Sequence, residues 1–127
     1  MMMQKKLLAI VAALVLFGLA VPQRAWSAAG AVTVTGYVLD SACAFTKSLK
    51  KPISPACAVA CAKAGSPLVV MSYDGTIYLP ISDATPAKGQ NERLMKFAGK
   101  KVIVTGKLYN KNGAHALVIE KIAAVGQ

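Results

Sequence analysis

The residues of this chain best suited to chemistry are three cysteines, Cys43, Cys57 and Cys61, in a C-x13-C-x3-C pattern. Cys57 and Cys61 are four residues apart, so on a helix they would share one face. Cys43 precedes this segment and could fold onto the same face. Three thiols in one short stretch can form a disulfide, bind a soft metal ion or carry out thiol exchange.

A structural disulfide is the interpretation that the sequence favours. It would join Cys43 to Cys57 or Cys61 and leave one free thiol, because a bond between Cys57 and Cys61 fits helical geometry poorly. An oxidising compartment permits such a bond. Closing a loop of this length contributes about 3 kcal/mol in the chain-entropy model. We therefore expect the cysteines to be mainly structural.

Two alternatives stay open for the same thiols. The first is a copper or zinc site with the three cysteines as ligands, in which His115, the only histidine, or Met71 would be the fourth ligand. The second is a thiol-redox pair, although the chain contains no C-x-x-C motif. No cofactor is expected with a structural disulfide, and copper or zinc is expected only with the first alternative.

Residues for other kinds of catalysis do not form a useful pattern. The five acidic residues include no pair with useful local spacing, and one histidine with no nucleophile motif around any serine argues against a catalytic triad. The sequence also lacks a glycine-rich loop of the kind that cradles phosphate. We expect a binding protein and no enzyme, and we assign no catalytic residue.

The start of the chain has the pattern of a secretory signal peptide. Two lysines, Lys5 and Lys6, precede an uninterrupted apolar run from Leu7 to Val21. Small residues then allow cleavage after Ser27 or after Ala29. The apolar run is shorter than the roughly 20 residues that span a bilayer, so no membrane span is expected after cleavage.

This pattern predicts a periplasmic or secreted protein, with a signal peptide at residues 1–29 and a single domain at residues 30–127. Removing residues 1–29 takes away three basic residues, which leaves 12 basic residues against five acidic ones and a net charge of about +7. So positive a domain favours an anionic polymer or an acidic protein as its partner. Nucleic acid is not expected as the ligand, because the domain is predicted to lie outside the cytoplasm.

The candidate ligand-binding surface combines aromatic and basic residues. Tyrosines on predicted strands could stack on flat ligand groups, and a lysine cluster follows the first strand. These candidates are Tyr37, Tyr73, Tyr78, Tyr109, Lys47, Lys50 and Lys51.

The mature sequence predicts five strands and two short helices. Alternating apolar and β-branched residues indicate strands at residues 31–39, 68–73, 76–81, 101–109 and 115–125. Helices are expected at residues 55–64, with Ser54 as N-cap, and at residues 90–98. Asp74-Gly75 predicts a two-residue type I′ turn, Gly36 a bulge or a close backbone approach, and residues 40–55 an irregular segment.

Five strands with a helix between the third and fourth have the order of an oligonucleotide/oligosaccharide-binding (OB) barrel. The predicted fold is therefore mainly β with short helices, namely a five-stranded OB-like barrel. The cysteine-containing helical segment is an insertion between the first two strands. The alternative is a small open sheet packed on the helices.

Four segments of the sequence carry a resemblance to a known group of proteins. They are TGYVLDSAC, CAVACAKAGSPL, DGTIYLP and FAGKKVIVTGKL, at residues 35–43, 57–68, 74–80 and 97–108. With its Asp-x-x-Cys and later Cys-x-x-x-Cys pattern, the chain resembles small secreted bacterial OB-fold proteins of unknown function. The resemblance implies the OB fold and export, and it brings no established activity.

Overall fold

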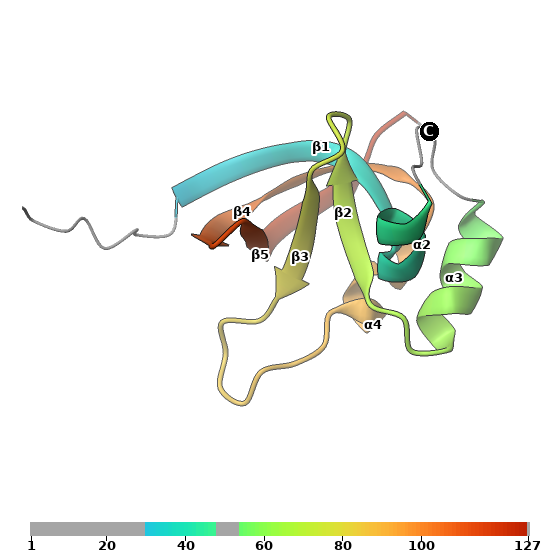
Figure 1. The fold of residues 1–127 in the computed structure, drawn as a ribbon, viewed down its shortest axis with the longest axis horizontal. Helices are drawn as coiled ribbons and strands as arrows, with labels where there is room; N and C mark the ends of the chain where they lie inside the picture. The colour runs from blue at the N-terminus through green and yellow to red at the C-terminus, as the bar shows by residue number, and fades with distance from the viewer. Residues whose placement is uncertain (1–29, 48–53, 127) are drawn as a thin grey trace, which may run out of the picture.

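The computed structural model describes residues 30–47 and 54–126, and its strands close into a five-stranded barrel (Figure 1). The barrel order is β1-β2-β3-β5-β4, in which β3 and β5 pair in parallel and the other neighbours are antiparallel. The strands are β1 (Gly30–Asp40), β2 (Leu68–Ser72), β3 (Ile77–Ile81), β4 (Lys101–Lys111) and β5 (Ala114–Ala124). The predicted OB-like barrel is confirmed, whereas the predicted signal peptide lies outside the described residues.

Two helices form the insertion between β1 and β2, and Figure 1 shows them together at one end of the barrel. They are α2 (Ser41–Thr46) and α3 (Pro55–Lys63), and they carry all three cysteines. The predicted insertion is thus confirmed, and Ser54 caps α3 as expected by accepting a hydrogen bond from the Cys57 N–H at 3.2 Å. Across the described ranges, no helix is long and apolar enough to cross a membrane.

Helix α2 corrects the prediction that residues 40–55 are irregular. The carboxylate of Asp40 accepts a hydrogen bond from the Cys43 N–H, which satisfies a backbone donor in the first turn. The helix has only six residues, too few for an apolar period to be recognised in the sequence. Between β3 and β4, α4 (Asn91–Leu94) and the 3-10 turn η1 (Met95–Phe97) replace the single helix expected at residues 90–98.

Two glycines allow neighbouring strands to approach closely. Strand β1 pairs with β4 along most of its length and with β2 at its end, and Gly36 lies where it passes from one partner to the other. A Cβ at Gly36 would collide with the main-chain carbonyl of Met71, which confirms the predicted close approach. Gly106 on β4 approaches the carbonyl of Val118 on β5 in the same way, beside a bulge in their pairing.

The prediction of a type I′ turn at Asp74-Gly75 is wrong. Only Gly75 has a positive φ there, and the Gly75 N–H donates to the Ser72 carbonyl across a three-residue loop. The Asp74 carboxylate accepts from the Thr76 N–H and stabilises this longer loop. The positive φ angles of a type I′ turn occur instead at Asn112 (49°) and Gly113 (85°), between β4 and β5.

Apolar side chains form two clusters, one inside the barrel and one on its outer surface. The inner cluster joins strand residues to Ala58 and Ala62 of α3, whose small side chains let the helix lie close to the barrel end. The outer cluster is formed where α2 covers β1 and β2. It consists of Leu39, Ala44, Val69 and Met71, with Tyr37 and Ile77 packed against it.

Candidate functional site

Asp40 lies at the end of β1 and is the most deeply buried charged residue of the described chain, with 1% of its surface exposed. Its Oδ2 accepts a hydrogen bond from the Cys43 N–H at 3.1 Å and one from the Ser66 hydroxyl at 3.3 Å. Its Oδ1 is buried and has no hydrogen-bond partner among the described residues. A buried carboxylate oxygen without a partner is costly, so this atom marks a place where a further group could bind.

The three cysteines lie in the two helices of the insertion at different depths. Cys43 is buried in the first turn of α2, Cys57 is exposed on α3, and Cys61 lies one turn later and is half-buried. All three are free thiols, so the predicted disulfide is absent from the structure. The Cys43 thiol forms a hydrogen bond with the carboxylate of Asp40 instead.

The electrostatics keep the carboxylate ionised and the inner thiols protonated. Burial alone would raise the pKa of Asp40, but hydrogen bonds from Cys43 and Ser66 outweigh it and the pKa is lowered. A hydrogen bond to Asp40 and burial raise the pKa of Cys43. Desolvation, followed by the charge of Asp40 and the neighbouring Cys57, raises the pKa of Cys61. Of the charged groups acting on these thiols, Asp40 is the anion and Lys47 is the cation.

The two predicted fourth metal ligands have other neighbours. The His115 Nδ1 lies 2.6 Å from the Asn110 Oδ1, and its ring is 5.7 Å from that of Tyr78. Met71 is packed in the outer apolar cluster. In residues 30–47 and 54–126, no group of three or more Cys, His, Asp or Glu residues is already arranged to hold a metal.

The four candidate tyrosines do not line one groove. Tyr37 and Tyr73 meet edge to face, with ring centroids 5.4 Å apart. Tyr78 lies against His115 and packs on the inner cluster, while Tyr109 is on β4 and exposed. The split arises because Tyr37, Tyr78 and Tyr109 lie on three different strands, whereas Tyr73, which was predicted to lie on a strand, is in the turn after β2.

The predicted lysine cluster is only partly described. Lys47 is exposed at the end of α2, whereas Lys50 and Lys51 lie outside the described residues. Two lysines missed by the sequence analysis, Lys100 and Lys101, lie instead beside the paired tyrosines. The sequence predicted that a strand begins at these lysines. Only the pairing of β4 with β1, however, brings the start of β4 beside Tyr37.

We call Tyr37, Tyr73, Lys100 and Lys101 the tyrosine–lysine surface. The ammonium of Lys101 lies 5.2 Å from the centroid of the Tyr73 ring, and hydrogen bonding with Tyr73 raises the pKa of Lys101. A surface hollow of about 450 Å³ is lined by Tyr37, Lys100, Lys101 and residues 124–126. Tyr73 is 57% exposed, so its ring is accessible beside the Lys101 ammonium.

The usual ligand face of OB domains is covered in this protein. OB domains commonly bind across strands 2 and 3 and the neighbouring loops. Here α2 lies over the outer face of β2, and Val69 and Met71 are 1% and 7% exposed. The tyrosine–lysine surface borders this covered face through Tyr37.

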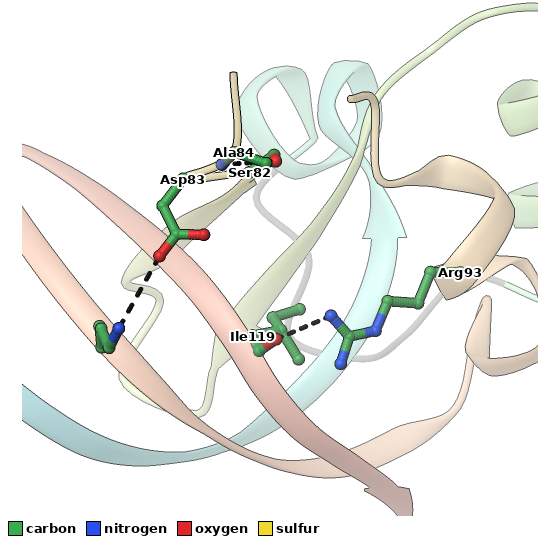
Figure 2. Close-up of polar contacts among 6 residues, drawn as sticks. Ser82, Asp83, Ala84, Arg93 and Ile119 are labelled. Atoms are coloured by element: carbon green, nitrogen blue, oxygen red, sulfur yellow. Dashed lines mark hydrogen bonds and ion pairs between the residues drawn. The ribbon is translucent and has the colours of Figure 1, made fainter. Parts of the chain in front are cut away.

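A second basic hollow, of about 600 Å³, lies beside α4 and is lined in part by Arg93, Lys96 and Lys121. Figure 2 shows that the Arg93 guanidinium is hydrogen-bonded within the protein, because its Nη1 donates to the Ile119 carbonyl at 2.7 Å. A second contact, to the Glu120 carbonyl, ties Arg93 to the β5 bulge. Asp83, which is labelled in the same view, forms an ion pair with Lys107 at 3.8 Å. Arg93 is thus a structural residue, and no sequence motif pointed to it.

Asn91 is another residue that the sequence analysis missed. Its side-chain oxygen accepts from the Leu68 N–H at 2.8 Å, and its amide donates to the Ser66 carbonyl at 2.8 Å and the Ala62 carbonyl at 3.3 Å. Asn91 therefore fixes the end of α3 against the start of β2. By holding Ser66 it also supports the hydroxyl that binds Asp40.

Comparison of the chain with known protein families, with curated proteins and with solved structures finds no match.

Proposed function

We propose that this protein is exported to the periplasm or secreted, and that its OB-like domain binds an anionic polysaccharide without catalysing a reaction. The single observation that carries the proposal is the tyrosine–lysine surface. There, Tyr37, Lys100 and Lys101 line one hollow, and the ring of Tyr73 lies 5.4 Å from that of Tyr37. Export rests on the basic and apolar pattern of residues 1–29.

The chemistry of this surface suits a ligand with both flat and charged parts. An exposed aromatic ring offers an apolar face at low cost in conformational entropy. The lysine ammonium groups supply charge for carboxylate or sulfate groups. Asp74 directly follows Tyr73 in the turn. Its carboxylate accepts hydrogen bonds from Ser72 and Thr76, and these bonds lower the pKa of Asp74.

A carbohydrate polymer fits better than nucleic acid because of the proposed location. OB domains bind both oligosaccharides and oligonucleotides, but an exported domain meets acidic polysaccharides of the cell envelope. The net charge of about +7 on residues 30–127 would attract such a polymer from a distance. An acidic protein partner is the competing outcome of the test.

Replacing Lys100 and Lys101 by alanine is expected to weaken binding to polygalacturonate, used as the acidic probe, at least tenfold at low salt. It should also flatten the dependence of affinity on salt, because fewer counterions are released. Tyr73→Ala should weaken binding at all salt concentrations, because it removes the ring. Binding can be followed by calorimetry.

The matched control is the double variant Lys88→Ala and Lys111→Ala, which removes the same charge elsewhere on the surface. The loss of affinity in this control should be less than half of the loss in the Lys100 and Lys101 variant. Equal weakening in both double variants would mean that net charge alone attracts the polymer. Absence of binding by the unaltered domain would reject the polysaccharide and leave an acidic protein to be tested.

A further inference from the structure

We infer that the protein binds an internal segment of its acidic polysaccharide, which continues from the tyrosine–lysine surface along the outer face of β4 into the basic hollow beside α4. We call the outward residues Lys101, Ile103 and Thr105, with their neighbours on β1 and β5, the β4 track. The polymer extends in this direction because α2 covers the adjoining outer face of β1 and β2. The inference rests on the proposed function, because it lengthens the same binding site.

The first argument is the alternation of side chains along β4. Val102 and Val104 lie in the inner cluster, and the residues between and beside them are exposed or half-buried. Lys101, Ile103 and Thr105 therefore point away from the barrel. Successive outward side chains of a strand are about 7 Å apart, so these three span about 14 Å. The track is thus longer than one sugar ring.

The neighbouring strands widen the track. Thr35 of β1 pairs with Ile103, and Thr33 pairs with Thr105. On the other side of β4, Lys121 of β5 also pairs with Thr105. These rows offer hydroxyl groups for sugar hydroxyls, an apolar side chain for the face of a ring and an ammonium for a carboxylate.

The second argument is that the track joins two hollows. Residues 124–126 line the hollow of the tyrosine–lysine surface, whereas residues 120–123 line the hollow beside α4. Lys101 lines the first hollow and Ile103 the second, and these two residues are neighbours on one face of β4. A polymer can therefore pass from one hollow to the other along the surface.

The third argument is charge. The hollow beside α4 is lined by three basic residues and one acidic residue, namely Arg93, Lys96, Lys121 and Glu120. Within residues 30–47 and 54–126, neither Lys96 nor Lys121 forms an ion pair with a carboxylate. Both ends of the track therefore attract anionic groups, and a polymer with a carboxylate on every ring supplies one at each end.

The test compares digalacturonate with hexagalacturonate by calorimetry at low salt. Both should bind the exported protein, the hexamer at least tenfold more tightly, because only the hexamer reaches the hollow beside α4. The double variant Lys96→Ala and Lys121→Ala should weaken hexamer binding at least tenfold and change dimer binding by less than about twofold. Circular dichroism should confirm that the variant folds.

The matched control is the double variant Lys63→Ala and Lys111→Ala, which removes two exposed lysines that line neither hollow. It should weaken hexamer binding by less than about threefold. Equal affinity for the dimer and the hexamer would overturn the inference and leave the proposed function standing. Equal weakening of hexamer binding in both double variants would also overturn it. If neither oligomer binds, the proposed function fails and the inference fails with it.

Discussion

Gly106→Ala is expected to lower the free energy of unfolding by about 3 kcal/mol, near the upper end for overpacking in a closed structure. The added Cβ would meet the main-chain carbonyl of Val118, which belongs to the paired strand and cannot rotate away. Relief requires β4 and β5 to separate beside their bulge, and these strands share the longest ladder of the barrel. Urea unfolding followed by circular dichroism measures the change.

Gly89→Ala is the control for this prediction. Gly89 has open space around its Cα and no positive φ, so an added Cβ meets nothing. The control should change stability by less than about 1 kcal/mol, and in the stabilising direction if the unfolded chain loses entropy. If both variants unfold at the same urea concentration as the unaltered domain, the close strand contact at Gly106 does not exist in solution.

Asp40→Asn is expected to destabilise the domain by about 2 kcal/mol at neutral pH, the range for hydrogen bonds to a charged group. Asn keeps the shape but removes the charge that accepts from Cys43 and Ser66. The pKa of Asp40 in the folded state is lowered from the ordinary value of 3.8. Its stabilisation is therefore present above that value and is lost as pH falls through the folded pKa.

The variant and the unaltered domain should thus become equally stable in acid, as the pH falls below 3.8 and through the folded pKa of Asp40. Asp74→Asn is a suitable control, because the pKa of Asp74 is also lowered, in this case by hydrogen bonds with Ser72 and Thr76. Asp74 is exposed, so solvent screens its interactions and its effect should be the smaller one. A stability difference for Asp40→Asn that is constant with pH would show that its charge has no role.

Much of the fold could be predicted because its signals are local. Alternating apolar residues located the strands, and Ser54 with Pro55 located the start of α3. The turn at Asp74-Gly75 was assigned the wrong geometry, because the same dipeptide also suits a three-residue loop with only Gly75 at positive φ. Helix α2 was missed because six residues show no period, although the Asp40 cap was a readable signal.

The candidate sites depend on contacts between distant segments, and these could not be derived from spacing. The sequence placed three thiols in one insertion, but it did not show that Ser66 would join Cys43 in binding Asp40. The sequence also did not show that the four tyrosines lie in different places, because the surroundings of each tyrosine depend on how the strands pair. Lys101 reaches Tyr73 only because β4 and β2 both pair with β1.

The most direct test of the central structural claim, that Cys43, Cys57 and Cys61 are free thiols, is a thiol count on the exported protein. The protein would be exported in a bacterial host, purified from the periplasm without reductant and alkylated after removal of metal, with intact mass recorded. We predict a chain beginning at Ala28 or Gly30, with three alkylated thiols. One intramolecular disulfide and a single alkylated thiol would contradict the account and restore the cysteines to a structural role.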